Sequence, residues 1–313
     1  MSPRRTRHSP HPRRPIALIE APTNLGLKPP AEGREPGVRR MPDALRALGL
    51  HEALGAESVE RVEAPPYRPE REPPTGVRNA RAIAAYSADL AHAVEAALDG
   101  GCFPLVVGGD CSVLLGSALA LRRRGRYGLV YVDGHEDFLT PARSPSGGAA
   151  GMDLALAAGC GPDELAALDG LRPLVHPEDI VVAGFRDEGE PYDHPDVEPA
   201  RAAVTRYGLA ALRDAGMAAA AEHIAGRVAR PELAGAWLHL DVDVLDDAIM
   251  PAVDSPQPDG LTPAELETLV APLLDSGAIV GAEVTIYDPD LDPTGAAGRR
   301  LVGVLERLFA HRR

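Results

Sequence analysis

Short, wholly apolar runs alternate with longer amphipathic segments along most of the chain. The apolar runs show no every-second-residue polar pattern and indicate buried strands at residues 15–22, 104–107, 128–133, 180–184, 236–241 and 279–284. Between them, helices are expected at residues 42–50, 80–98, 112–124, 155–168, 198–215, 217–229, 263–276 and 294–311. Buried strands that alternate with helices are typical of a parallel sheet covered on both faces, so the pattern predicts an α/β fold.

Neither an internal repeat nor a change of composition divides the chain. We therefore expect a single domain over residues 15–313. Residues 1–14 are rich in arginine and proline, and no apolar segment of the signal-peptide kind follows them. These residues are predicted to form a disordered basic tail.

Charge and cysteine content narrow the possible partners. The chain has 32 basic and 46 acidic residues, a formal net charge of −14, which disfavours nucleic acid and favours small cationic substrates. No apolar run approaches the ~20 residues of a membrane span, so an integral membrane protein is excluded. Three cysteines, Cys102, Cys111 and Cys160, cannot build a disulfide framework, and a reducing cytoplasm is predicted.

Acidic motifs follow three of the predicted strands. They are residues 108–112 (GGDCS), 133–137 (DGHED) and 241–246 (DVDVLD). In extended chain, residues two apart point to the same side, and open α/β sheets place their sites at the carboxyl ends of the strands. Four aspartates and a histidine are therefore expected to converge in one crevice.

Such a cluster of carboxylates is strongly repulsive unless cations neutralise it. Carboxylates with an imidazole suit Mn²⁺ or a similar divalent ion, and so many donors favour two ions over one. A solvated turn explains one such motif alone but not two at the ends of buried strands. A structural metal is disfavoured because structural sites usually close their shell with Cys and His.

At these residues the chain resembles the ureohydrolase superfamily, which comprises arginases, agmatinases and related binuclear-manganese amidinohydrolases. The segments that carry the resemblance are GGDCS (108–112), DGHEDFLTP (133–141), DVDVLDDAIMP (241–251) and GAEV (281–284). Their order and spacing agree over residues 79–290. The resemblance implies a three-layer α/β/α sandwich with a mostly parallel central sheet, and a homo-oligomer such as a trimer or hexamer.

The resemblance also implies a set of metal ligands for two Mn²⁺ ions. Asp133 and Asp241 would bridge the two ions. His135 and Asp243 would complete one of them. Asp137 would bind the other ion together with Cys111, which stands where the family has a histidine. We expect Cys111 to ligate because the flanking residues of its motif are retained.

Catalytic and substrate-binding roles follow in the same way. Asp137 would pass a proton from the metal-activated water to the leaving amine, and Glu283 would hold the substrate guanidinium. The substrate's α-carboxylate would be bound by three residues of the loop that follows Asp137: Arg143, Ser144 and Ser146. Two acidic residues, Asp187 and Glu190, would meet its ammonium group.

Several positions depart from the family pattern. Leu139 and Ala150 stand where arginases have an asparagine and a histidine thought to shuttle protons. His176 or His194 is a candidate replacement for that histidine if its loop reaches the site. His239, two residues before Asp241, is expected to be a buried histidine with satisfied hydrogen bonds.

The resulting prediction is hydrolysis of L-arginine to L-ornithine and urea. Within the superfamily the alternatives are agmatinase, formimidoylglutamase and hydrolases of other guanidino acids such as hydroxyarginine. Outside enzymes, the alternative is a metal-binding pseudoenzyme that acts as a regulatory module. An assay of urea release discriminates the two classes.

Overall fold

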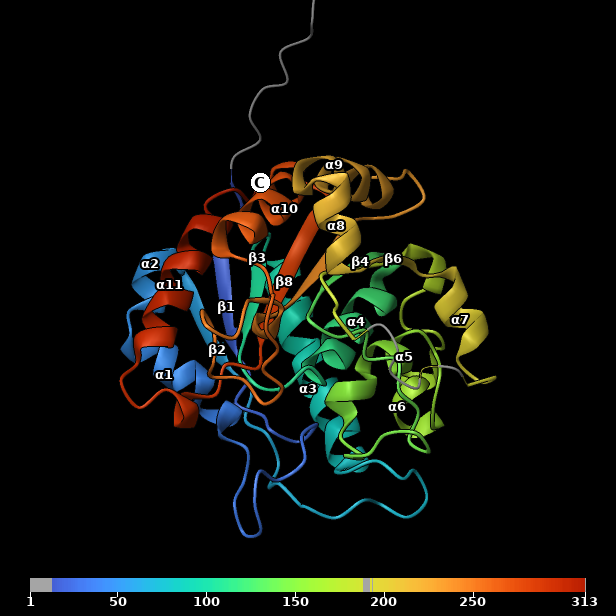
Figure 1. The fold of residues 1–313 in the computed structure, drawn as a ribbon. Coiled ribbons are helices and arrows are strands. Elements are labelled where there is room, and N and C mark those ends of the chain that lie inside the picture. Colours follow the sequence, from blue (N-terminus) through green and yellow to red (C-terminus); the bar gives the residue numbers. More distant parts are fainter. Residues whose placement is uncertain (1–12, 188–191, 193, 313) are drawn as a thin grey trace, which may run out of the picture.

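The protein is described by a computed structural model that covers residues 13–187, 192 and 194–312 (Figure 1). Its strands are β1 (Ile16–Glu20), β2 (Ser58–Arg61), β3 (Phe103–Val107), β4 (Gly128–Val132), β5 (Ile180–Ala183), β6 (Thr205–Tyr207), β7 (Ala236–Asp241) and β8 (Ile279–Thr285). They form one eight-stranded sheet in the order β2-β1-β3-β8-β7-β4-β5-β6, and every neighbouring pair is parallel.

Helices cover both faces of this sheet, as Figure 1 shows. They are α1 (Met41–Ala47), α2 (Leu50–Leu54), α3 (Ala80–Asp99), α4 (Val113–Arg124), α5 (Asp153–Ala157), α6 (Asp163–Ala166), α7 (Glu198–Ala203), α8 (Leu209–Ala215), α9 (Met217–Val228), α10 (Pro263–Asp275) and α11 (Ala296–Phe309). The predicted three-layer α/β/α sandwich is confirmed.

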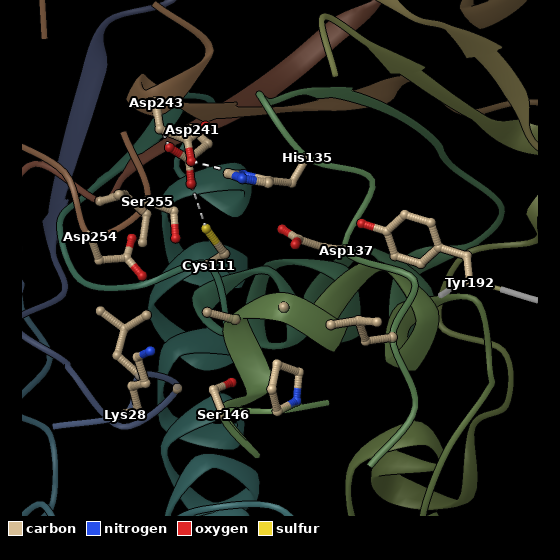
Figure 2. A pocket seen from close by; sticks show the side chains of 17 residues that line it. Lys28, Cys111, His135, Asp137, Ser146, Tyr192, Asp241, Asp243, Asp254 and Ser255 are labelled. Carbon is tan, nitrogen blue, oxygen red and sulfur yellow. Dashed lines mark hydrogen bonds and ion pairs between the residues drawn. The ribbon is translucent and has the colours of Figure 1, made fainter. Parts of the chain in front are cut away.

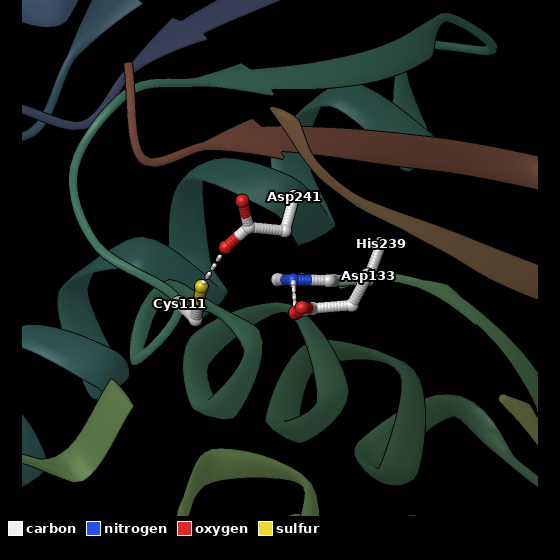
Figure 3. A group of neighbouring side chains, drawn as sticks. All are labelled: Cys111, Asp133, His239 and Asp241. Carbon is white, nitrogen blue, oxygen red and sulfur yellow. Dashed lines mark hydrogen bonds and ion pairs between the residues drawn. The ribbon is translucent and has the colours of Figure 1, made fainter. Parts of the chain in front are cut away.

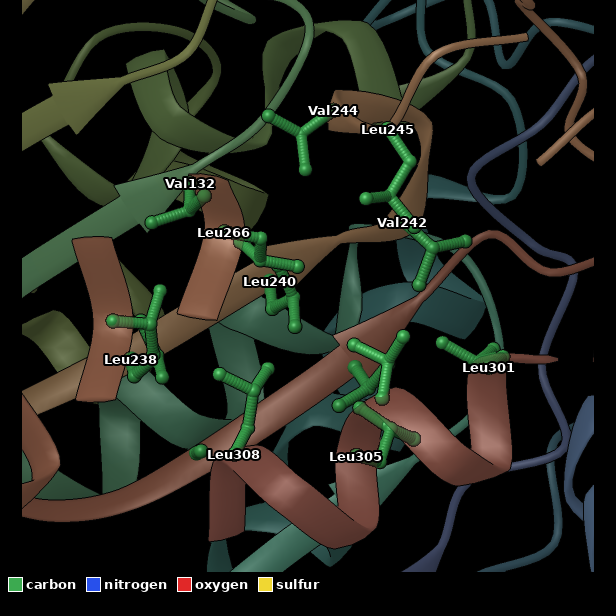
Figure 4. Packing of buried hydrophobic residues seen from close by; sticks show 14 of the residues in the cluster. Val132, Leu238, Leu240, Val242, Val244, Leu245, Leu266, Leu301, Leu305 and Leu308 are labelled. Carbon is green, nitrogen blue, oxygen red and sulfur yellow. The ribbon is translucent and has the colours of Figure 1, made fainter. Parts of the chain in front are cut away.

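Alternate residues of each central strand enter two separate hydrophobic clusters. Leu238 and Leu240 of β7 pack with α10 and α11 on one face, where Leu266 and Leu305 meet them (Figure 4). Trp237 of the same strand belongs to the cluster on the opposite face, with residues of α3 and α4. This double burial explains why the strands are apolar throughout their length.

The edge strands were not predicted. All four residues of β2 are exposed, and β6 is a three-residue strand that interrupts the region predicted as one helix, residues 198–215. That helix prediction was wrong in its middle. An edge strand covered on neither face needs no apolar run, so hydrophobic periodicity carries no signal for it.

Most of the predicted tail, residues 1–12, lies outside the described residues. Arg14, at its end, is held by the fold: its Nη2 donates to the Ile279 carbonyl at 3.1 Å, and its guanidinium lies over the Phe103 ring. Among the described residues, no helix is both long and apolar enough to cross a membrane.

A capping box begins α10. The Thr262 hydroxyl accepts from the Glu265 backbone N–H at 3.2 Å, and the Glu265 carboxylate accepts from the Thr262 N–H at 2.8 Å. Replacing Thr262 with alanine should lower the free energy of unfolding by about 1 kcal/mol, because helix-end donors lose their partner. Thr268→Ala in the same helix is the matched control and should not destabilise. Equal urea midpoints for the two variants would contradict the prediction.

Candidate metal centre

The carboxyl ends of β3, β7 and β4 lie near one another in the middle of the sheet, with β8 between β3 and β7. After β3, Gly108 and Gly109 adopt positive φ angles of 106° and 78°. A Cβ atom at Gly109 would lie 2.4 Å from Thr23 Cγ2, so only glycine fits this turn. The turn places Cys111 just before α4, facing the end of β7.

One group of candidate metal ligands consists of Cys111, Asp133, His239 and Asp241, all buried (Figure 3). Their donor atoms lie within 4.8 Å of one another. The Cys111 thiol donates to Asp241 Oδ2 at 2.8 Å. His239 was predicted to be a satisfied buried histidine, but its Nε2 has no hydrogen-bond partner among the described residues. The ring is buried as predicted and its Nδ1 bonds to Glu283, but the prediction that its hydrogen bonds are all satisfied is wrong.

A second group consists of Asp133, His135 and Asp243. His135 Nδ1 lies 3.0 Å from Asp243 Oδ2 and 3.6 Å from Asp133 Oδ1. Asp133 belongs to both groups, which is the arrangement expected of a carboxylate that bridges two ions. The donors of this group are one imidazole and two carboxylates, a set that suits Mn²⁺.

The electrostatics of the two groups fit cations. Burial, together with the charge of Asp243, raises the pKa values of Asp133 and Asp241. Burial and the nearby carboxylates also raise the pKa of the Cys111 thiol. The buried Asp133 Oδ2 has no hydrogen-bond partner among the described residues. A divalent cation bound here would stabilise the ionised carboxylates and give the Asp133 oxygen a partner.

Asp137 is positioned beside the two groups but belongs to neither of those found among the described residues. Its backbone has a φ of 49°, and the Tyr131 hydroxyl donates to its Oδ2 at 2.7 Å. Burial and the charge of Asp133 raise its pKa well above the usual range. Its carboxylate faces the pocket (Figure 2).

A pocket of about 260 Å³ opens onto these groups. Residues from both donor groups line it together with a mixed polar and apolar wall: Gly26, Leu27, Lys28, Cys111, His135, Asp137, Leu139, Pro145, Ser146, Ala150, Gly151, Tyr192, Asp241, Asp243, Asp254, Ser255 and Ile286. In Figure 2 the metal-ligand candidates lie on one side, and Lys28 and Ser146 lie on the other. The pocket thus has an acidic region and a region that can bind an anion.

The predicted substrate residues of the loop after Asp137 occupy different places. Ser146 lines the pocket. Ser144 is buried behind it, where its hydroxyl lies 3.2 Å from the Ser146 hydroxyl and accepts from the Gly147 N–H. Arg143 is exposed and is not among the lining residues. The basic side chain in the pocket wall is instead Lys28.

The acidic candidates are also dispersed. Asp187 is buried behind the pocket, where it accepts from the Glu136 N–H at 3.1 Å and from the hydroxyl of Tyr192. Glu190 lies outside the described residues. Glu283 is fully buried and is not among the lining residues; its carboxylate bonds to Ser117 and His239. The role predicted for Glu283 in holding the guanidinium stays a prediction.

Several residues that line the pocket were not predicted from the sequence. Lys28 is the single lysine of the chain, which was the available signal. Tyr192 and Asp254 have no motif around them. Leu139 and Ala150 line the pocket as apolar wall, and neither His176 nor His194 is among its lining residues.

Comparison with known proteins agrees with this architecture. The family model described as "Arginase family" matches residues 14–309. The chain is 30% identical over 308 residues to an arginase of Bacillus caldovelox, covering 96% of this chain and 99% of that protein. It is 30% identical over 311 residues to an arginase of Bacillus subtilis, covering 94% and 97%.

The solved structure of the Bacillus caldovelox arginase is similar to the whole fold. It superposes with a TM-score of 0.83 at 29% identity, covering 95% of this chain and 98% of that one. Family model, full-length relatives and fold therefore agree with one another. The chain belongs to the arginase family, whose enzymes hydrolyse amidino C–N bonds.

Proposed function

We propose that this protein hydrolyses the guanidino group of L-arginine to give L-ornithine and urea, with two Mn²⁺ ions as cofactors. The observation that carries the proposal is the pocket itself. Two candidate metal-ligand groups meet at one side of it, and a lysine and a serine face them from the other. A substrate with a cationic guanidinium and an anionic carboxylate matches both sides.

Some of these residues would hold the metal ions, and one would transfer a proton. His135, Asp243 and Asp133 would hold one ion, and Cys111 and Asp241 would contribute to the other. Divalent cations at such positions lower the pKa of water into the neutral range and supply the nucleophile. Asp137, with its carboxylate at the pocket, accepts the proton of the attacking water and delivers it to the leaving amine.

Lys28 is the residue that would discriminate L-arginine from agmatine. Its side chain is exposed at the pocket wall, and it forms no ion pair with any residue of the described parts of the chain. An α-carboxylate would pair with Lys28 and accept a hydrogen bond from Ser146. Agmatine, the decarboxylated analogue, would bring only positive charge toward that lysine. This contrast favours L-arginine over the agmatinase alternative.

The testing experiment measures urea release from the purified protein supplied with Mn²⁺. L-arginine, agmatine and a series of guanidino acids are compared by kcat/KM, and L-arginine is expected to exceed agmatine by at least about 100-fold because unpaired site donors are costly. A kcat/KM for agmatine equal to that for L-arginine would overturn the proposal that L-arginine is the substrate. No urea from any guanidino compound would favour the pseudoenzyme alternative. A homo-oligomer in the cytoplasm remains our expectation.

Replacing Lys28 with alanine should lower kcat/KM for L-arginine by about 10- to 100-fold, because an ion pair with the carboxylate is lost. The value for agmatine should stay the same or rise. Arg143→Ala is the matched control, because it removes an equal charge from another exposed loop residue that does not line the pocket. If Arg143→Ala has the larger effect, the carboxylate-binding residue is Arg143.

A further inference from the structure

We infer that His239 is a metal ligand, that it completes a Cys111–Asp133–His239–Asp241 site which prefers Zn²⁺ or Co²⁺ to Mn²⁺, and that Glu283 is its positioning residue. The inference rests on the divalent-cation chemistry of the proposed function and revises it in one point: Mn²⁺ is kept at one of the two positions, and Zn²⁺ or Co²⁺ replaces it at the other. It also gives Glu283 a role other than binding the guanidinium.

The first evidence is a pair of buried polar atoms that make no hydrogen bond. His239 is 0% exposed, and its Nε2 has no hydrogen-bond partner in the described residues. The facing atom, Asp133 Oδ2, is equally buried and also lacks a hydrogen bond in the described residues; it lies 3.9 Å from Nε2, an ion-pair contact that is too long for a hydrogen bond. Buried polar atoms in proteins are almost always hydrogen-bonded, so two that lack a hydrogen bond and face each other in an acidic cluster point to a cation-binding site. Figure 3 shows both side chains converging with Cys111 and Asp241.

The second evidence is the way in which the imidazole ring is held. His239 Nδ1 lies 2.7 Å from Glu283 Oε1, and the other Glu283 oxygen accepts from the Ser117 hydroxyl at 2.6 Å. The ring also stacks on Tyr131, with centroids 4.2 Å apart and planes 4° apart. Metal-binding histidines typically donate their second nitrogen to such a carboxylate, which fixes the ring and the tautomer.

Sheet register produces this arrangement. Tyr131 of β4, His239 of β7 and Glu283 of β8 lie opposite one another across three neighbouring strands. Residues in such a cross-strand row point to the same face of the sheet. The next position toward the carboxyl end of β7 on that face is Asp241, which belongs to the same donor group.

The tautomer follows from these contacts. The contact between Nδ1 and Glu283 Oε1 leaves Nε2 as the ring nitrogen that faces Asp133, and a neutral ring with its proton on Nδ1 has its lone pair there. The neutral form with Nε2 free is the form in which histidine binds a metal.

The donor chemistry decides the metal. Thiolate and imidazole with two carboxylates make four donors of mixed softness, a set typical of Zn²⁺ and also suited to Co²⁺. The second group, Asp133, His135 and Asp243, has no sulfur and suits Mn²⁺. The Cys111 thiolate therefore gives the two positions different metal preferences. With His239 and Cys111 in one group, Asp137 is left free to carry protons.

The test uses the full-length protein freed of metal and titrated with Co²⁺, whose thiolate complexes absorb in the near ultraviolet. One equivalent should produce a sulfur-to-cobalt charge-transfer band and strong visible bands typical of four-coordinate cobalt. His239→Gln should weaken Co²⁺ and Zn²⁺ binding at this position by more than about 100-fold. Losing a residue that only orients a metal-binding histidine typically lowers metal affinity by about 10- to 100-fold. We expect a loss of this size for Glu283→Gln.

Matched variants separate the two positions. Cys111→Ser should abolish the charge-transfer band, whereas His135→Ala, which alters only the other group, should leave it intact. Cys111→His should shift the preference of the first position from Co²⁺ toward Mn²⁺. In competition, wild-type protein should retain one equivalent of Zn²⁺ in the presence of equimolar Mn²⁺.

Unchanged affinity and spectrum in His239→Gln would show that His239 is only a buried core histidine. If that variant does not fold, X-ray absorption of the wild type with one equivalent of Zn²⁺ decides the matter. One sulfur and at least one imidazole in the shell are expected, and a shell of oxygen alone would overturn the inference. Urea release is measured separately: intact spectra without activity would contradict the proposed function and leave this metal site standing.

Discussion

Replacing Asp137 with asparagine should lower kcat for urea release by about 10²- to 10⁴-fold, because an amide cannot accept and return a proton. The metal content should change little, since Asp137 belongs to neither donor group found in the described residues. The fold should also survive. Burial and Asp133 raise the pKa of Asp137, so its ionised form opposes folding, and an uncharged side chain removes that cost.

The control for this prediction is Tyr131→Phe, which removes the hydroxyl that donates to Asp137 but keeps the ring stacked on His239. Loss of one hydrogen bond corresponds to roughly a tenfold effect on kcat. An Asp137→Asn variant that keeps more than a tenth of the wild-type kcat would show that another group carries the proton. Thermal unfolding of both metal-free variants checks that neither loss of rate reflects unfolding.

The second large effect is expected at Glu136, whose side chain is 1% exposed beside His135. Arg201 binds both of its carboxylate oxygens at 2.8 and 2.9 Å, and Arg206 approaches them at 3.2 Å. Replacing Glu136 with alanine should lower the free energy of unfolding by about 1.5–3 kcal/mol, because the charged hydrogen bonds of a buried carboxylate to two partly exposed arginines are lost. The loop between β4 and η2 (Ala149–Met152), which carries the candidate ligands Asp133 and His135, would lose its anchor at the same time.

Denaturation in urea measures this loss, and the free energy of unfolding is compared with that of Glu178→Ala. Glu178 also binds an arginine, Arg126, at 3.0 Å, but its side chain is 53% exposed. Such a surface pair contributes at most about 1 kcal/mol. If the two variants lose equal stability, burial of the Glu136 pair does not determine its contribution.

Much of the scaffold could be predicted because its signals are local. A strand buried on both faces must be apolar at every position, and the runs at residues 104–107, 128–133 and 236–241 correspond to β3, β4 and β7. The acidic motifs follow those strands directly, so parallel pairing alone brings their side chains to one edge of the sheet. The candidate ligands Asp133, His135 and Asp243 were found in this way.

What only the tertiary structure decided concerns residues that meet across strands and loops. His239 and Glu283 lie on different strands, and the register of β7 against β8 determines that they pair. Likewise, the path of a loop places Lys28 in the pocket wall and leaves Arg143 exposed, although both are basic loop residues. Period and spacing describe a side chain relative to its own segment, whereas its partners depend on lateral register and loop packing, which arise only when the whole chain folds.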